Sequence, residues 1–417
     1  MMNRTELSGR LGLFTVGMGA VATTLMAGVE LARRGQRKPV GAYSQTGWIT
    51  DAEGQRRPVP AAVPLAALDE IVFGGVDLIE TNARDAARTA GVLSDADLAL
   101  VGDFLATVSA GPGVHDAGYV RTLETMQTRP EKNKFEQAAA MTRVFKAFFA
   151  ENGCARGVVL LTLSTEAWRP VAAVHASPEA FVAGLHANDP EISPSQIYAW
   201  AAIEAGYPVV NCTPNVVHEV PAIVAQATAR GVPLAGSDLK SGQTLMKTVV
   251  AAGLAKRLLG VRGWFSTNIL GNRDGFVLDV PENFRAKEIS KGGVLSDIFD
   301  EKEHPELYRD LVHQVHINYF PPKGDNKEAW DAIQLFGWLG YEMELKINFQ
   351  CRDSILAAPL VLDLALFMDL AARHGETGIQ SWLGGYFKSP AARAGEQVTN
   401  DLNLQIAVIE TKLRGWM

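Results

Sequence analysis

The N-terminal part of the chain alternates apolar runs with a glycine-rich turn. Leu11–Val16 is a short apolar run suited to a buried parallel strand. Residues 17–22 (GMGAVA) follow it, and an apolar helical stretch continues to Arg34. Gly35 is a helix stop, and Pro39–Tyr43 is predicted as a second strand. The pattern indicates a strand, glycine turn, helix and strand.

Strands and helices continue to alternate through the middle of the chain. The predicted strands are Gly157–Thr162, Pro208–Asn211 and Val232–Ala235, and the predicted helices are Ser195–Ala205, Val217–Arg230 and about Ser241 to Leu259. This alternation is typical of a parallel sheet covered by helices on both faces.

The texture changes from about Val261. Longer amphipathic strands are predicted at Val261–Asn268, Val312–Tyr319 and Glu342–Gln350, separated by turn-rich segments. They suit an open mixed sheet in a second domain, and the apolar helix Ile355–Ala372 could return to the first.

Composition narrows the class of protein. At 417 residues and 47% hydrophobic content, the chain can bury a large core in two or three domains. The net charge of −7 comes without a basic stripe, which argues against nucleic-acid binding. Cys154, Cys212 and Cys351 lie far apart, as expected for reduced thiols in a cytoplasmic protein. The uncharged run 11–29 resembles a signal peptide, but its glycines, threonines and polar end argue against secretion or a membrane span.

The turn fits the dinucleotide fingerprint, with Gly17, Gly19 and an alanine at its third position, Ala22. Gly17 would allow the tight turn, and Gly19 would let the backbone approach a pyrophosphate at the helix N-terminus. A plain tight turn remains the alternative. The predicted second strand ends without the acidic residue that usually binds the adenosine ribose, so spacing does not decide between NAD and NADP.

Lysines and carboxylates gather in several loops. Asp238 is placed to orient a ligand or a lysine, and Lys240, Thr244 and Lys247 would share one helix face. Each group also has a bland interpretation, as a capped helix with solvated lysines or a polar turn. On composition and spacing, the prediction stops at an α/β enzyme with a dinucleotide fold.

Five segments together resemble the myo-inositol-phosphate synthase family. They are 238–244 (DLKSGQT), 268–275 (NILGNRDG), 284–291 (FRAKEISK), 324–327 (GDNK) and 353–359 (DSILAAP). Weaker matches are 211–215 (NCTPN), 162–166 (TLSTE) and the glycine turn. The strong matches run in family order across about 211–390.

The resemblance implies a Rossmann-type domain, 1–245 and 366–417, and a central α+β catalytic and tetramerisation domain with an open mixed sheet, 246–365. It implies a bound NAD and the isomerisation of glucose 6-phosphate to an inositol phosphate, through oxidation at C5, enolisation, aldol cyclisation and reduction. Oxygen anions develop in this sequence and the substrate carries a phosphate dianion, which explains a need for several lysines. It leaves open whether ammonium or a divalent cation assists.

The resemblance also assigns residues by their match to the family's motifs. The catalytic set would be Lys287, Lys291, Lys327, Lys388, Asp238 and Asp353. The cofactor and substrate pocket would include Asp238, Ser241, Asn272, Asp274, Asp325, Asp353 and Ser354. The dinucleotide cleft would be lined by Gly17, Gly19, Ala20, Val21, Ala22, Asp77, Thr162, Thr165 and Cys212.

The chain departs from the family pattern at several positions. Ala20, Val21 and Ala22 stand where asparagines and another glycine are usual, and Arg352 replaces an acidic residue. Two other functions stay open: a sugar-phosphate dehydrogenase that releases NADH, and a catalytically inactive dinucleotide sensor. The four lysines that match the family's motifs favour the isomerising synthase over both alternatives.

Overall fold

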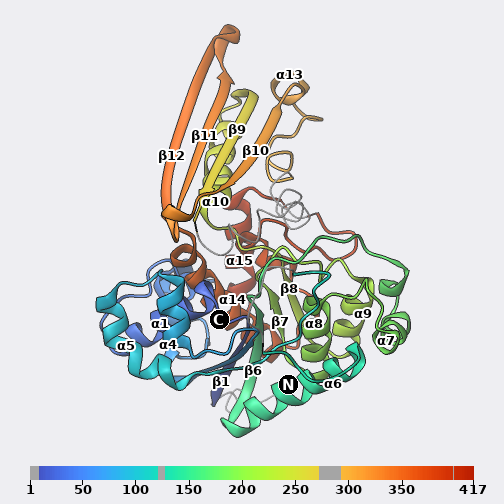
Figure 1. Ribbon diagram of the computed structural model, residues 1–417. Coiled ribbons are helices and arrows are strands. Elements are labelled where there is room, and N and C mark those ends of the chain that lie inside the picture. Colours follow the sequence, from blue (N-terminus) through green and yellow to red (C-terminus); the bar gives the residue numbers. More distant parts are fainter. Residues whose placement is uncertain (1–8, 121–126, 272–292, 398) are drawn as a thin grey trace.

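The computed structural model describes residues 9–120, 127–271, 293–397 and 399–417. A seven-stranded parallel sheet forms the lower body of the molecule, and a second, four-stranded sheet rises above it (Figure 1). The strands of the parallel sheet, in spatial order, are β13 (Gly378–Ile379), β8 (Pro233–Gly236), β7 (Val209–Asn211), β6 (Cys154–Leu161), β1 (Arg10–Val16), β4 (Ile71–Asp77) and β5 (Ala110–Pro112).

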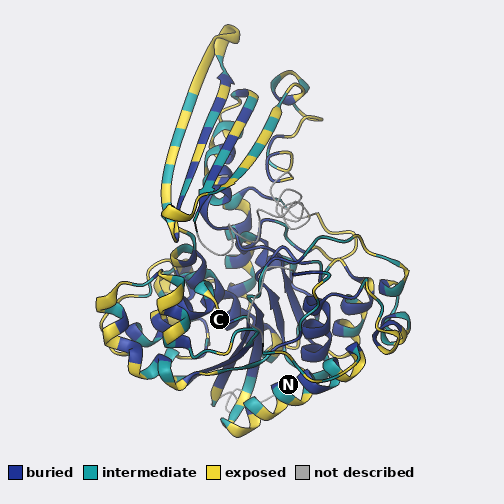
Figure 2. Ribbon diagram, in the orientation of Figure 1, coloured by how far each residue is buried: buried dark blue, intermediate teal, exposed yellow. Residues whose placement is uncertain are grey.

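Helices cover both faces of this sheet, as the apolar strand runs predict. Leu11 and Leu13 of β1 pack into one core cluster, and Phe14 and Val16 pack into another. The first cluster is closed by α1 (Ala20–Arg33), α4 (Ala83–Ala90), α5 (Asp95–Thr107), α14 (Asp353–Arg373) and α15 (Leu402–Arg414). The second is closed by α6 (Lys134–Glu151), α7 (Pro178–Ala187), α8 (Pro194–Ala205) and α9 (Pro221–Ala229). Figure 2 shows the buried strands between helices whose outer faces are exposed.

The segment Pro39–Tyr43, predicted as the second strand, is not a strand. Val40 is 77% exposed, and Gly41 takes a positive φ of 90°. The chain then turns into the short helix α2 (Tyr43–Thr46), whose first two amides donate to the buried carboxylate of Asp363. The strand beside β1 is instead β4, with Leu11 opposite Ile71. The strand that pairs with β1 is therefore a longer apolar run that lies further along the chain.

The second sheet has the order β10-β9-β11-β12. Its strands are β9 (Gly260–Leu270), β10 (Val312–Tyr319), β11 (Asn326–Phe336) and β12 (Glu342–Arg352). β9 and β10 are parallel and the other pairs are antiparallel, so the sheet is mixed, as predicted. Helix α10 (Gly242–Lys256) contacts β9, β11 and β12. Other short elements are α3 (Val59–Ala62), α13 (Pro305–Tyr308), β2 (Trp48–Thr50), β3 (Arg56–Pro58) and several 3₁₀ turns.

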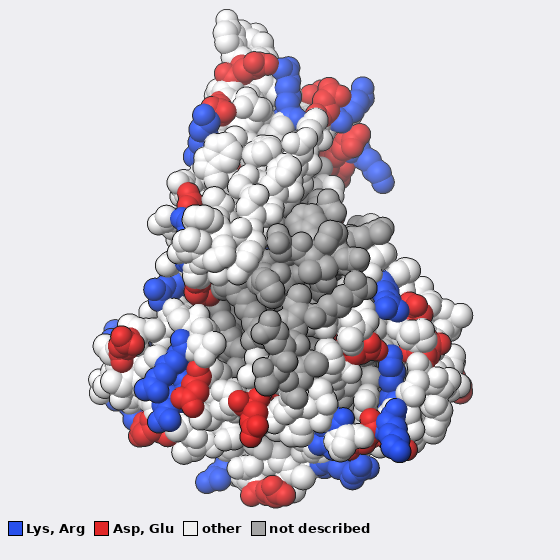
Figure 3. Space-filling view, in the orientation of Figure 1, with Lys and Arg blue, Asp and Glu red and all other residues white. Residues whose placement is uncertain are grey.

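Helix α14 returns the chain from the second sheet to the first, as the sequence predicts. It is long and apolar enough to cross a membrane, but 72% of its apolar window is buried inside the fold. It packs on α1 and β6, so it is a core helix. On the face drawn in Figure 3, acidic and basic side chains of the described residues are interspersed.

Candidate active site

The glycine turn lies at the carboxyl end of β1, at the N-terminus of α1. Gly17 has a φ of +95°, and a Cβ there would lie 2.7 Å from the backbone of Thr162 and Leu163. A side chain is therefore excluded at residue 17. Gly19 is the N-cap of α1, and a Cβ there would meet no atom within 4 Å. Ala20 and Val21 are half-buried and Ala22 is buried in the first turn of the helix. This open helix N-terminus suits a pyrophosphate.

An acidic side chain does stand at the turn, and it comes from β4. Asp77, the last residue of β4, accepts a hydrogen bond from the Met18 amide through Oδ2 at 2.5 Å. The prediction that the strand beside β1 ends without an acidic residue was wrong, because it assumed that Pro39–Tyr43 was that strand. Thr162, just after β6, donates from Oγ1 to the Gly17 carbonyl at 2.7 Å.

Two further residues predicted to line the cleft follow the adjoining strands. Thr165 is 4% exposed in the segment after β6. Cys212 follows β7, and burial raises the pKa of its thiol far above the ordinary value. Because only the thiolate is a strong nucleophile, Cys212 is suited to lining the cleft rather than to covalent chemistry.

The first lysine–carboxylate pair is held by a backbone ladder between two distant segments. The Ser237 amide donates to the Ser389 carbonyl at 2.9 Å, and the Lys388 amide donates to the Asp238 carbonyl at 2.7 Å. The ladder sets the Lys388 ammonium 2.9 Å from Oδ1 of Asp238. Both side chains are buried, with 7% and 4% of their surface exposed. Each buried group therefore has its counter-charge within hydrogen-bond distance.

The second pair joins β11 to the first residue of α14. Lys327 Nζ donates to Oδ2 of Asp353 at 2.7 Å. Burial alone raises the pKa of Asp353, but the charges of Lys327 and Lys388 outweigh it and hold that pKa well below its usual range. The charges of both lysines therefore stabilise the Asp353 carboxylate, and the two pairs form one cluster.

The N-terminus of α10 lies against this cluster. Gly242, its first residue, has a φ of +55°. A Cβ on Gly242 would lie 2.9 Å from Oδ1 of Asp353 and 3.5 Å from Lys327 Nζ. Ser241 is the N-cap of this helix. Asp325, just before β11, and Ser354, the second residue of α14, are both buried. Glycine is therefore needed at residue 242 for the helix end to reach the charges.

A cavity of about 450 Å³ opens beside Lys388. Its walls include His218, Asp297, Ser389 and Asn400. This volume lies within the range of small-molecule sites. Among the described residues, no group of three or more His, Cys, Asp and Glu side chains could hold a metal ion.

Comparison with known proteins identifies the family. The family model described as myo-inositol-1-phosphate synthase matches residues 11–414. The chain belongs to the myo-inositol-1-phosphate synthase family. It is 45% identical over 409 residues to inositol-3-phosphate synthase 1 of Bacteroides thetaiotaomicron, covering 98% of this chain and 95% of that protein. It is 32% identical to the inositol-3-phosphate synthase of Spirodela polyrhiza, covering 97% of this chain and 85% of the relative.

A solved relative shares the whole architecture. The crystal structure of inositol-3-phosphate synthase from Caenorhabditis elegans superposes with a TM-score of 0.91 at 26% identity, over 98% of this chain and 87% of that chain. The predicted fold class, a Rossmann-type parallel sheet with an additional mixed sheet, is thereby confirmed.

Within this family member, the structure brings together Lys327, Lys388, Asp238 and Asp353 from four separate segments. Their catalytic roles remain predictions. Lys287, Lys291, Asn272 and Asp274 lie outside the described residues.

Two lysines of the synthase fold were misread from the sequence. Lys240 precedes α10 rather than sharing a helix face with Lys247, and each is 2% exposed, so the interpretation as solvated lysines was wrong. Lys247 Nζ lies 2.7 Å from His313 Nε2 of β10, and burial lowers the pKa of Lys247 to about 8. The spacing of residues in the sequence does not indicate which side chains Lys240 and Lys247 contact.

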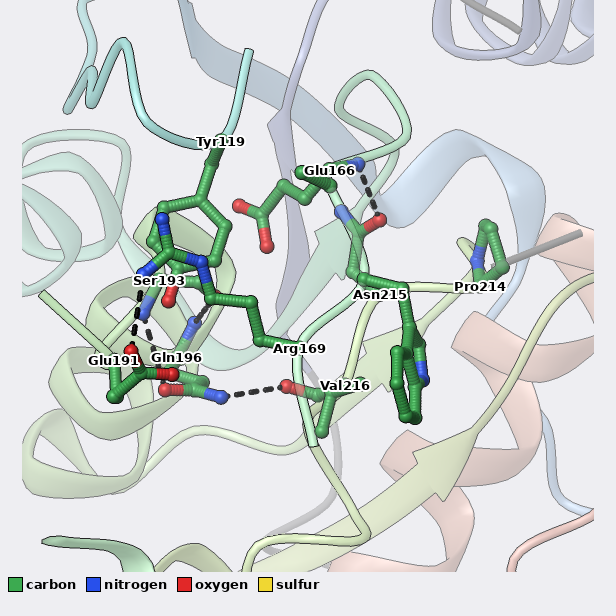
Figure 4. Close-up of a pocket in the computed structure, with 11 residues that line it drawn as sticks. Tyr119, Glu166, Arg169, Glu191, Ser193, Gln196, Pro214, Asn215 and Val216 are labelled. Atoms are coloured by element: carbon green, nitrogen blue, oxygen red, sulfur yellow. Dashed lines mark hydrogen bonds and ion pairs between the residues drawn. The ribbon is translucent and has the colours of Figure 1, made fainter. Parts of the chain in front are cut away.

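Glu166, in the weakly matching segment 162–166, is buried beside the N-terminus of α8. Its Oε1 accepts from the Ser195 amide at 2.8 Å. Its own amide donates to Asn215 Oδ1 at 2.9 Å (Figure 4). Burial raises the pKa of Glu166 to about 7. The adjoining cavity of about 10 Å³, also lined by Tyr119 and Arg169, is the size of one water molecule. Glu166 therefore ties the segments after β6 and β7 to α8.

Proposed function

We propose that this protein is an inositol-3-phosphate synthase, which isomerises D-glucose 6-phosphate to 1D-myo-inositol 3-phosphate with NAD as a retained cofactor. The observation that supports the proposal most is the convergence of two lysine–aspartate pairs, Lys388–Asp238 and Lys327–Asp353, in a chain with a dinucleotide fold. The 45% identity to a synthase over nearly the whole chain supports the same substrate.

The residues around the glycine turn fit NAD. Gly19 leaves open space at the N-terminus of α1, Gly17 keeps the turn tight, and Asp77 offers a carboxylate at the end of the neighbouring strand. When bound in this cleft, NAD would supply a reversible hydride acceptor for a substrate carbon. Thr162, Thr165 and Cys212 would line the same cleft.

The two charged pairs would act on the substrate. The ammonium groups of Lys327 and Lys388 are fixed by carboxylates, so they can stabilise oxyanions at the enolate and aldol stages without reorganisation. Asp353 stays ionised at neutral pH because its pKa is held low, so its role is to orient Lys327 rather than to donate a proton. Asp238 would orient Lys388 in the same way.

Lys287 and Lys291 complete the proposed catalytic set by their match to the family motif. The free helix end at Ser241 and Gly242, next to Lys327, would suit the substrate phosphate.

We further propose that the protein is a cytoplasmic homotetramer that serves inositol and phospholipid biosynthesis. All three cysteines are free, which suits a reducing compartment. Phe265 and Trp330 are each 37% exposed, and their rings form an edge-to-face pair with centroids 6.0 Å apart. An exposed aromatic sheet face of this kind suits contact with another copy. The division at 245/246 and 365/366 is retained as a proposed domain boundary.

The proposal is tested by incubating purified protein with glucose 6-phosphate and a catalytic amount of NAD. Formation of a non-reducing phosphate ester without net growth of NADH absorbance supports the synthase. Net NADH would identify a dehydrogenase, and absence of turnover with retained NAD binding would identify a sensor.

A further inference from the structure

Lys240 is a buried lysine that the proposed chemistry does not use. Its Nζ donates to Oδ1 of Asn400 at 3.0 Å and to Oε1 of Gln405 at 2.7 Å. Both acceptors are neutral amides, whereas buried ammonium groups usually meet carboxylates. Burial consequently lowers the pKa of Lys240 to about 7, against the opposing effect of Asp297. Such a costly arrangement calls for a role beyond packing.

The amides that hold Lys240 link it to the cavity wall and to the C-terminal segment. Asn400 donates from Nδ2 to Oδ2 of Asp297 at 2.8 Å, so its amide bridges a cation and an anion. Asn400 and Asp297 both border the cavity beside Lys388. Gln405, in the first turn of α15, donates to the Gly384 carbonyl at 3.1 Å, four residues before Lys388.

The backbone of Lys240 is part of the ladder that holds the first charged pair. Its amide donates to the Tyr386 carbonyl at 2.8 Å, next to the bond from the Lys388 amide to Asp238. Lys240 therefore holds the Lys388 side of the ladder in two ways: its amide bonds the Tyr386 carbonyl directly, and its side chain reaches the Gly384 carbonyl through Gln405.

We propose that Lys240 is a positioning residue that fixes the Lys388–Asp238 pair by clamping Asn400 and Gln405 of the C-terminal segment against the ladder. The proposal deepens the proposed synthase function, on which its kinetic prediction rests. Lys240 itself touches no reacting atom in this scheme. Its clamp keeps the Lys388 ammonium from leaving Asp238 and keeps the cavity wall in place.

Lys247 provides a matched control. It is as buried as Lys240, and its partner is the imidazole of His313 in the second sheet. A methionine at either position removes one buried ammonium and keeps a similar shape. If Lys240 had only a structural role, Lys240→Met and Lys247→Met would affect Lys388 and kcat alike and would differ only in melting temperature.

The first experiment needs no substrate, so it is independent of the proposed function. Full-length protein and the variants Lys240→Met, Lys247→Met and Asn400→Ala are treated with an acetylating reagent, and acetylation of each lysine is followed by peptide mass spectrometry. In Lys240→Met, acetylation of Lys388 should accelerate about fivefold or more, because a broken clamp exposes a group now 7% exposed. Asn400→Ala should give part of this increase, and Lys247→Met should give none.

Lys134, whose ammonium is buried on the carbonyls of Asp189 and Ile192, reports on general loosening. Its acetylation rate should stay at the wild-type value in all variants. An unchanged Lys388 rate in folded Lys240→Met and Asn400→Ala would overturn the proposal, as would a parallel rise at Lys134.

The second experiment separates positioning from binding. In Lys240→Met, kcat for glucose 6-phosphate should fall about tenfold to a hundredfold while KM changes little, because a small displacement of a catalytic group costs rate rather than affinity. Lys247→Met should keep its kcat. Wild-type kcat in Lys240→Met refutes the proposal, whereas absence of turnover in the wild type refutes the synthase function and leaves the acetylation result to stand alone.

Discussion

Lys327 and Asp353 meet at 2.7 Å although they belong to a strand of the second sheet and to the core helix of the first. Their contact lies where the two parts of the molecule join, and Gly242 packs against it from a third element. The charged cluster is therefore built by the junction of the two sheets, and its geometry depends on how α10, β11 and α14 end.

Substitutions that break the Lys327–Asp353 pair should lower kcat in a non-additive way. Lys327→Met and Asp353→Asn should each lower kcat by about a hundredfold or more, because each leaves the other group wrongly oriented. The double variant should be little worse than either single variant. The measurement is kcat and KM for all three, with NAD affinity measured separately.

Lys346→Met is a suitable control, since Lys346 is an exposed lysine of β12 with 59% of its side-chain surface accessible. Its kcat should match the wild type. Losses that simply multiply in the Lys327/Asp353 double variant would show that the two residues act independently.

Gly242→Ala should damage both stability and activity. The positive φ and the approach of a Cβ to Asp353 Oδ1 should together cost about 1–3 kcal/mol of unfolding free energy. The displaced carboxylate should also lower kcat. Urea unfolding and steady-state kinetics measure the two effects.

Gly253→Ala lies in the same helix, and a Cβ there would meet no atom within 4 Å. It should stabilise the protein by about 0.5–1 kcal/mol through helix propensity and leave kcat unchanged. Equal stability changes at residues 242 and 253 would contradict the steric argument.

Asp77 should determine the preference for NAD over NADP. Its carboxylate stands where the adenosine ribose is expected and would repel a 2′-phosphate. Asp77→Ser should weaken NAD binding about tenfold, as expected for loss of a charged hydrogen bond, and should narrow the NAD/NADP affinity ratio. Fluorescence titration with both dinucleotides gives the ratio. Asp85→Asn, on exposed α4, should leave it unchanged, and an unchanged ratio in Asp77→Ser would place the ribose elsewhere.

Glu166→Gln should alter how stability depends on pH. Burial raises the folded-state pKa of Glu166 to about 7. At pH values between the ordinary pKa of a glutamate and about 7, the folded chain therefore keeps a proton that the unfolded chain has lost. The unfolding free energy of the wild type must then fall as pH rises toward about 7, and that of the glutamine variant should lack this component. The stability difference should grow in favour of the variant between about pH 5 and 8, by up to roughly 3 kcal/mol.

Urea unfolding at several pH values measures this difference. Glu53→Gln, at an exposed position, is the control and should show no such trend. A pH-independent difference for Glu166→Gln would mean that its carboxylate ionises in its ordinary range.

The sequence predicts the sheet types and the central strands because their apolar runs are unbroken. It fails at Pro39–Tyr43, where Val40 is exposed and the strand that pairs with β1 comes from Ile71–Asp77. It also misses β11, in which every second residue is buried as in an ordinary strand, because two of the buried residues are Lys327 and Asp331 and the apolar pattern is broken there. In both places the deciding information is the tertiary partner.

The candidate site shows the same division. The lysines and aspartates were found through family motifs, and their convergence required the fold. Lys240 looked like a surface lysine because its acceptors, Asn400 and Gln405, lie some 160 positions later in the chain. Asp77 could be named only by resemblance, since local spacing pointed to another strand.

The proposed synthase would use NAD as a retained cofactor, so the hydrogen at C5 of the substrate would return to the same carbon in the product. Glucose 6-phosphate carrying deuterium at C5 should be converted in the presence of excess unlabelled NADH, and the product analysed by mass spectrometry and NMR. The account predicts that the inositol phosphate keeps its deuterium at the carbon derived from C5. Loss of deuterium from the product into free NADH would contradict it.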